Sequence, residues 1–315
     1  MPHRLRLVAA SLIPVALSAA PLAAQQQPPT PAAWAPVEEA LGRKGAMQPG
    51  DVIKFSFPRS DLSVTAAGVA LKPALALGGW VAFKEIGAGR AMAMGDLVLT
   101  EDEVNPVMQA LQQGGVEQTA LHNHVLNESP RVMYMHIAAH GDAAKIARTI
   151  HDALAQSKTP LGTPAAPAAP SAADLDTAAV AKALGVAGRL NGVVYQVSVP
   201  RREKITEMGH EVPPAMGVAT AINFQPTGGG KAAITGDFVM LGSEVNPVIR
   251  ALRSHGIQVT ALHSHMLDES PRLFFMHFWA NDDAATLARG LRAALDATNS
   301  QVAGRSASAG QPVKK

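Results

Sequence analysis

The sequence predicts an α+β protein made of two tandem, pseudo-symmetric repeats, each an antiparallel sheet with helices on one face. First, residues 120–143 recur as residues 261–284, and fourteen of the 24 positions are identical. Second, each copy follows the pattern strand, strand, helix, strand, strand, helix, which is most like a ferredoxin-like sandwich with extra strands. Third, each sheet would keep one uncovered face, which packing of copy against copy would bury. We therefore expect an intramolecular pseudo-dimer.

The ends of the chain and its middle differ in composition from the repeats. Residues 1–24 carry two arginines, an apolar run broken by Pro14 and small residues up to Ala24, which is typical of a cleavable signal peptide. We expect a secreted or periplasmic protein. The predicted segments that follow are a disordered lead-in (25–33), repeat 1 (34–158), an Ala/Pro linker (159–173), repeat 2 (174–299) and a disordered tail (300–315).

Each repeat is predicted to open with a short helix and a strand, followed by a hairpin of two strands around a glycine turn. In repeat 1 these elements are residues 37–41, 52–57, 80–84 and 90–99. The second copy keeps the same order, and from Gly68 onward the two copies match at a constant offset of 141 residues. An ungapped register of this length indicates that both copies share one fold.

The segment Glu-Val-Asn-Pro-Val comes next in both copies. Because Pro is favoured at the first turn of a helix and disfavours helix at the residue before it, we expect Asn105 and Asn246 to cap helices that run to Gly114 and Gly256. The glutamates of this segment, Glu103 and Glu244, are expected to have a structural role there, although they could also reach the histidines described below.

Histidines recur at equal spacing in the duplicated segment. Apolar and aromatic residues dominate two arms around a break at residues 127–130, which predicts two strands joined by a short turn. His122 and His124, two residues apart, would share a face, and pairing around Ser129 would set His122 opposite His136 and His124 opposite Tyr134. Glu128 would arrive from the turn. The second copy repeats this set as His263, His265, His277 and Glu269.

Three neutral imidazoles and a carboxylate on one face are suited to a divalent transition metal, zinc first, with copper or iron as further options. The chain has no cysteine, so a metal would be held by His and carboxylate alone. The alternative is structural: half-buried sheet histidines held by hydrogen bonds, with Glu128 paired to Arg131. Whether the two sites share a cleft stays open at this stage.

His210 has no histidine counterpart, since Val69 stands at its position in repeat 1. It lies beside Glu211 in a Gly/Pro-rich loop, and loops of this kind often carry catalytic groups, so we regard His210 as a candidate catalytic residue together with Glu128 and Glu269. The sequence has no nucleophile elbow, P-loop or dinucleotide fingerprint. Removal of residues 1–24 would leave basic and acidic residues in balance, which gives no indication of nucleic acid as a partner.

The segments GDFVML, EVNPVIRALRSHGIQVTALHSHMLDESPR and FFMHFWA resemble the LppY/LpqO family of exported bacterial proteins. The resemblance covers nearly the whole chain after residue 24 and occurs in two copies. It implies an exported protein, but no reaction. Some relatives are lipoproteins, whereas this chain has no cysteine to carry a lipid.

The function that these observations favour is an exported metal-binding protein, possibly a metal-dependent hydrolase that acts on a cell-envelope or small-molecule ligand. Glu128 or Glu269 would then serve as general base or fourth ligand. Two alternatives stay open: a non-catalytic periplasmic protein that binds metal or a small ligand, and a structural envelope protein without metal. No membrane span is expected after the leader.

Overall fold

The computed structural model describes residues 30–162 and 174–302. The predicted signal peptide, most of the lead-in and the linker, and nearly all of the tail lie outside these residues. Repeat 1 contains α1 (Ala35–Leu41), β1 (Ala46–Gln48), β2 (Val52–Pro58), β3 (Thr65–Ala66), β4 (Val69–Ala70), α2 (Pro73–Ala76), β5 (Gly78–Gly87), β6 (Arg90–Thr100), α3 (Glu101–Gln113), β7 (Glu117–His122), β8 (Glu128–Ser129), β9 (Val132–Asp142) and α4 (Ala143–Leu154). A single 3-10 turn, η1 (Ala32–Trp34), precedes α1.

Repeat 2 has the same order of elements, with a 3-10 turn in place of α2. It contains α5 (Thr177–Leu184), β10 (Arg189–Asn191), β11 (Val194–Pro200), β12 (Thr206–Glu207), β13 (His210–Glu211), η2 (Pro214–Met216), β14 (Ala219–Gly228), β15 (Lys231–Leu241), α6 (Gly242–Ser254), β16 (Gln258–His263), β17 (Glu269–Ser270), β18 (Leu273–Asp283) and α7 (Ala284–Asp296). The predicted duplication of an α+β unit is confirmed.

Each repeat forms one six-stranded antiparallel sheet. The strand order is β1-β2-β5-β6-β9-β7 in repeat 1 and β10-β11-β14-β15-β18-β16 in repeat 2. The order β5-β6-β9-β7, with α3 between β6 and β7 and α4 after β9, is that of a circularly permuted ferredoxin-like sandwich. Strands β1 and β2 are the extra strands, added at the β5 edge.

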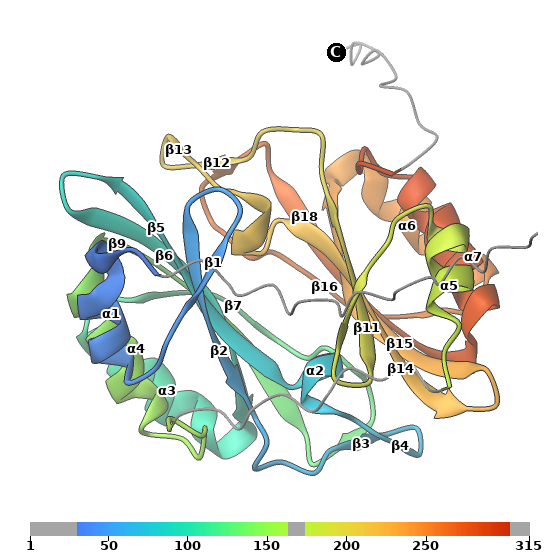
Figure 1. Cartoon of the computed structure of the whole chain (residues 1–315), viewed down its shortest axis with the longest axis horizontal. Coiled ribbons are helices and arrows are strands. Elements are labelled where there is room, and N and C mark those ends of the chain that lie inside the picture. The colour runs from blue at the N-terminus through green and yellow to red at the C-terminus, as the bar shows by residue number, and fades with distance from the viewer. Residues whose placement is uncertain (1–29, 163–173, 303–315) are drawn as a thin grey trace, which may run out of the picture.

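The two sheets face each other, and the helices cover their outer faces, so that the molecule has four layers (Figure 1). Apolar side chains at alternate positions of each sheet pack against the helices of the same repeat and form two separate cores. Two further clusters join the repeats. The segment between β2 and β5 packs on the inner sheet face of repeat 2, and the segment between β11 and β14 packs on that of repeat 1. The inner faces are thus covered copy against copy.

The predicted start of the helix after β6 is wrong. Helix α3 begins at Glu101, four residues before Asn105, and Pro106 lies inside it. Thr100 is the cap residue, and its backbone N–H donates to the Glu103 carboxylate (2.9 Å). In repeat 2, α6 likewise begins at Gly242 rather than after Asn246. Both helices share the contact from the cap residue to the glutamate, since the Leu241 N–H likewise donates to Glu244 (2.7 Å), and this contact outweighs the local preference of an Asn-Pro pair.

The expected structural role of the two glutamates is confirmed. Glu103 also accepts from the fully buried Arg59 guanidinium (2.6 Å), and Glu244 forms the matching pair with Arg201 (2.7 Å). Each pair ties a helix start to the segment after the first long strand. The last helix of each repeat is capped by an aspartate, since Asp142 accepts from the Lys145 N–H and Asp283 from the Thr286 N–H. No described helix is long and apolar enough to cross a membrane.

Candidate metal centre

Six histidines from both repeats meet between the two inner sheet faces. The shortest contacts between their rings join the repeats: the ring centroids lie 3.6 Å apart for His122 and His263, 3.8 Å for His124 and His277, and 3.8 Å for His136 and His265. Within repeat 1 the spacing is wider, 5.0 Å from His122 to His136. The two sites expected in separate repeats therefore form one composite cluster.

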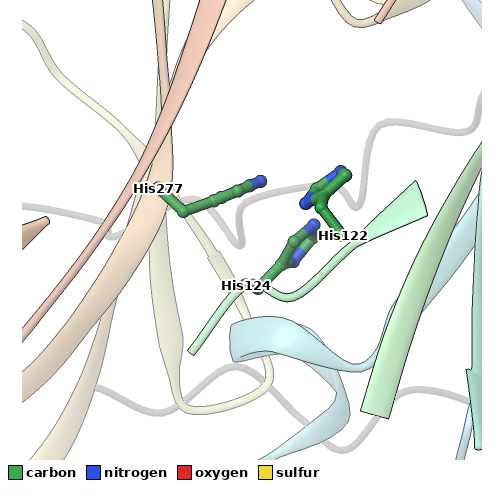
Figure 2. A group of neighbouring side chains, drawn as sticks. All are labelled: His122, His124 and His277. Atoms are coloured by element: carbon green, nitrogen blue, oxygen red, sulfur yellow. The ribbon is translucent and has the colours of Figure 1, made fainter. Parts of the chain in front are cut away.

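Figure 2 shows how one part of this cluster is assembled, with His122 and His124 from the β7 end of repeat 1 approaching His277 on β18 of repeat 2. His122 is the last residue of β7, and His124 lies in the loop that follows. The pseudo-symmetric arrangement places His263 at the end of β16 and His265 in the next loop. Each repeat thus contributes one histidine from a central strand and two from the end of an edge strand.

The predicted pairing within the hairpin is wrong by two residues. Ala120 lies opposite His136 and His122 opposite Tyr134, and the register shifts again between Gln118 and Ala120. The connection is also longer than a tight turn, because residues 128–129 form β8 and pair with β3. A shift of two residues preserves the face to which a side chain points, since the strand period is two. His122 and His136 therefore still point to the inner face, as predicted, although they are not directly opposite each other.

Two threonines hold the histidine loops across the boundary between the repeats. The Thr119 hydroxyl on β7 donates to the carbonyl of His265 (2.6 Å), and the Thr260 hydroxyl on β16 donates to the carbonyl of His124 (2.6 Å). The Asn123 amide also donates to the Thr260 carbonyl (3.2 Å). Each histidine loop is therefore fixed by the edge strand of the other repeat.

Two aspartates that were not predicted as site residues complete the cluster. Asp96 on β6 has an oxygen 3.6 Å from His124 Nε2 and another 4.0 Å from His136 Nε2. Asp237 on β15 lies 2.9 Å from His265 Nε2 and 3.9 Å from His263 Nε2. Asp96 is the direct cross-strand partner of His136. The signal that could have found them is a duplicated Gly-Asp pair in the middle of an otherwise apolar strand.

The cluster is buried, and one ring nitrogen of each histidine lacks a hydrogen bond. The Nε2 atoms of all six histidines are buried without a hydrogen-bond partner, as is one oxygen of each aspartate. Several Nδ1 atoms are engaged instead: that of His277 donates to the Gly236 carbonyl (2.6 Å), and that of His122 to the Asn123 carbonyl (3.0 Å). An imidazole that donates through Nδ1 presents the lone pair of Nε2, which is the arrangement found for metal-bound histidine.

The electrostatics of the cluster favour neutral imidazoles. Burial lowers the pKa of every histidine in it, to about 4 for His122 and to about 3 for His263 and His265. Burial, with Asp237 nearby, raises the pKa of Asp96 well above its usual range, and burial raises that of Asp237 to about 6. Neutral lone pairs beside buried carboxyl groups provide a site for a cation.

Three groups in the cluster bring ligand atoms within 4.8 Å of one another. They are His122 with His124 and His277, His122 with His136 and His263, and Asp237 with His263 and His265. Two of the three combine both repeats. A donor set of imidazole and carboxylate fits zinc, copper or iron, and eight donors exceed the roughly four that one zinc ion takes.

The predicted glutamates lie at the turns and belong to none of these groups. Glu128 accepts from the Val132 N–H (3.2 Å), and Glu269 accepts from the Leu273 N–H (2.8 Å) and pairs with Arg272 (3.2 Å). Arg131, the expected partner of Glu128, contacts Glu101 instead (3.5 Å). Both glutamates thus close the turn between the histidine loop and the following strand.

His210, the remaining candidate, lies on β13 outside the centre. Its ring faces His140, with 6.4 Å between the ring centroids. Like the glutamates, it is absent from the close groups of ligand atoms among the described residues.

Comparison with known proteins identifies a family for both repeats. One family model, described as Domain of Unknown Function (DUF1259), matches residues 35–156 and again residues 178–297. No curated protein matches the chain. Two solved structures are similar to it, a trimeric bacterial microcompartment shell protein PduB (13% identity) and EtuB from Clostridium kluyveri (10% identity). Each comparison covers 79% of this chain and 87% of the other, with a TM-score of 0.20, which is too low to carry an argument.

Proposed function

Because the chain belongs to the family described as Domain of Unknown Function (DUF1259), whose description states no activity, we propose a function from the centre alone: the protein binds transition-metal ions between its two repeats. The six histidines and two aspartates described above act as one composite centre. Zinc is the first expectation for this donor set, and copper or iron would also suit it.

The observation that carries the proposal is the set of six buried Nε2 atoms without partners. Buried polar atoms in folded proteins nearly always have a hydrogen-bond partner, and each one that lacks a partner costs about 1 to 3 kcal/mol. His265 Nε2 lies 2.9 Å from Asp237, so a purely structural role for the histidines would require the fold to carry this cost at the other five positions. Metal coordination satisfies the same six lone pairs.

Hydrolysis is the chemistry that we place first, and one observation favours it over closed storage of metal. The side chains of His124, Asp96 and Asp237 keep 13%, 11% and 14% of their surface exposed, so solvent reaches the carboxylate edge of the centre. A metal with an open position there would supply activated water or polarise a substrate. Asp96 or Asp237, rather than the glutamates at the turns, is then placed to accept a proton.

The second candidate function is non-catalytic binding of metal in the cell envelope. It would apply if coordination were closed, with no position left for water or substrate. Either function is proposed for an exported protein, in line with the signal-like residues 1–24 and the resemblance to the exported LppY/LpqO proteins.

The test is elemental analysis of full-length protein purified without a histidine tag, combined with variants. We expect stoichiometric metal in the parent protein and its loss when His263 and His265 are both replaced by Ala. Replacement of His151 and His255, which lie outside the centre, is the matched control and should leave the metal content unchanged. Folded parent protein that holds no zinc, copper or iron after exposure to each ion would refute the proposal.

A further inference from the structure

The two sides of the centre have different surroundings. The Asp96 side consists of Asp96 with His124 and His136, and the Asp237 side consists of Asp237 with His263 and His265. Most inward-facing positions near them are filled by different residues in the two repeats. One change in charge is at a position of the second strand, where repeat 1 has Lys54 and repeat 2 has Gln196; a second Lys-to-Gln change, Lys84 to Gln225, lies where the Lys84 ammonium donates to the Gly50 carbonyl (2.8 Å). The first two residues are matched by register, since Lys54 pairs with Ala82 on β5 and Gln196 with Asn223 on β14.

Lys54 places a cation close enough to Asp96 to lower the pKa of that carboxyl group, against the larger effect of burial. Its ammonium lies over the Trp80 ring, 3.8 Å from the centroid, and donates to the Ala215 carbonyl (3.2 Å). Trp80 is in turn the direct cross-strand partner of Asp96. Burial lowers the pKa of Lys54 to about 8, so the group is still mostly charged at neutral pH. Gln196 is neutral and donates to the Ala74 carbonyl (2.9 Å).

The ligands are also gathered more closely on the other side. His265 Nε2 is 2.9 Å from Asp237, whereas His124 Nε2 is 3.6 Å from Asp96. The trio of Asp237, His263 and His265 has its ligand atoms within 4.8 Å of one another, and neither the equivalent trio of repeat 1, Asp96 with His122 and His124, nor Asp96 with His124 and His136 is among the close groups of the described residues. A more compact ligand set needs less rearrangement to hold an ion.

From these two independent differences we propose that the centre takes two divalent ions in a fixed order, the first on the Asp237 side and the second, more weakly, on the Asp96 side, where Lys54 opposes it. This proposal rests on the proposed metal-binding function and adds to it the number of ions and their order. Repulsion between the two ions would by itself separate the binding steps, so the identity of the side that fills first is the decisive point.

The experiment is a titration of metal-free, full-length protein with Co²⁺, followed by visible absorption, with Zn²⁺ competition against a chelator to measure the affinity of each step. In the parent protein we expect two steps. Lys54→Gln, which places the residue of repeat 2 in repeat 1, should tighten the second step by about tenfold and leave the first unchanged. Lys54→Met removes the same charge, keeps the length of the side chain and should act alike.

Two further variants test the order directly. Asp237→Asn should remove the tighter step, and Asp96→Asn should remove only the weaker one. Binding of a single ion, two steps of equal affinity, or a Lys54 effect on the first step would each overturn the proposed order while metal binding itself stood. Absence of any binding to the folded parent protein would instead refute the proposed function.

Discussion

The threonine that holds a histidine loop from the opposite repeat gives the sharpest test of a shared centre. Thr260→Val keeps the shape of the side chain and removes the hydroxyl that donates to the His124 carbonyl at 2.6 Å. Thr260 is mostly buried, and loss of one such hydrogen bond typically costs about 1 to 2 kcal/mol. The loop that carries His124 in repeat 1 would be loosened by a change made 136 residues away in repeat 2.

The expected result is a lower stability of the metal-free protein by about 1 kcal/mol and an affinity for Zn²⁺ that falls about five- to tenfold, because binding must then order the loop. Urea unfolding measures the first quantity, and chelator competition measures the second. Thr206→Val is the matched control: its hydroxyl also donates to a carbonyl, that of Ser270 (3.3 Å), but at an exposed position outside the centre. Equal Zn²⁺ affinity in the Thr260 variant, the Thr206 variant and the parent protein would refute a centre held across the repeats.

Three further predictions concern stability. Because burial lowers the pKa of the six histidines in the folded state, proton uptake by the unfolded chain destabilises the metal-free protein between pH 7.5 and pH 5.5, and the raised pKa values of Asp96, Asp237 and Glu207 oppose that loss. Replacing His263 and His265 together by Ala should therefore make the urea midpoint fall less, or rise more, than in the parent protein between the two pH values; an equal change in both proteins would contradict this. Burial, with Glu269 nearby, raises the pKa of Glu207 to about 7, so its ionisation costs stability as the pH rises from about 4.5 to 7. Glu207→Gln should therefore exceed the parent protein by up to about 3 kcal/mol in urea unfolding at pH 8, with little gain at pH 4.5. Glu244→Gln leaves the buried Arg201 with a single carboxylate partner, Glu203, and should lower the free energy of unfolding, measured by thermal denaturation, by about 3 kcal/mol. The control is Glu211→Gln, which removes an exposed ion pair with Lys204 and should change the free energy of unfolding little.

The sequence was sufficient for the fold class and for the face to which the histidines point. A constant offset of 141 residues required two copies of one unit, and the alternation of apolar and polar residues defined strands with one helix-covered face and one free face. His122 and His136 were correctly predicted to lie on the same face although their pairing was wrong by two residues, because side chains alternate between the two faces and a shift of two residues keeps the face. The N-terminal ends of α3 and α6 were missed, since Glu103 and Glu244 accept from the backbone N–H of the cap residue and outweigh the Asn-Pro signal.

Only the tertiary structure decided that the six histidines form one centre and that Asp96 and Asp237 belong to it. A repeat in a sequence specifies what each copy contains, but not how far its residues lie from the pseudo-symmetry axis that relates the copies. Here the inner faces pack so that His122 meets His263 at 3.6 Å, and each histidine loop crosses to the edge strand of the other repeat. Those contacts join residues more than 130 positions apart, and they depend on the packing of two complete sheets rather than on any local pattern.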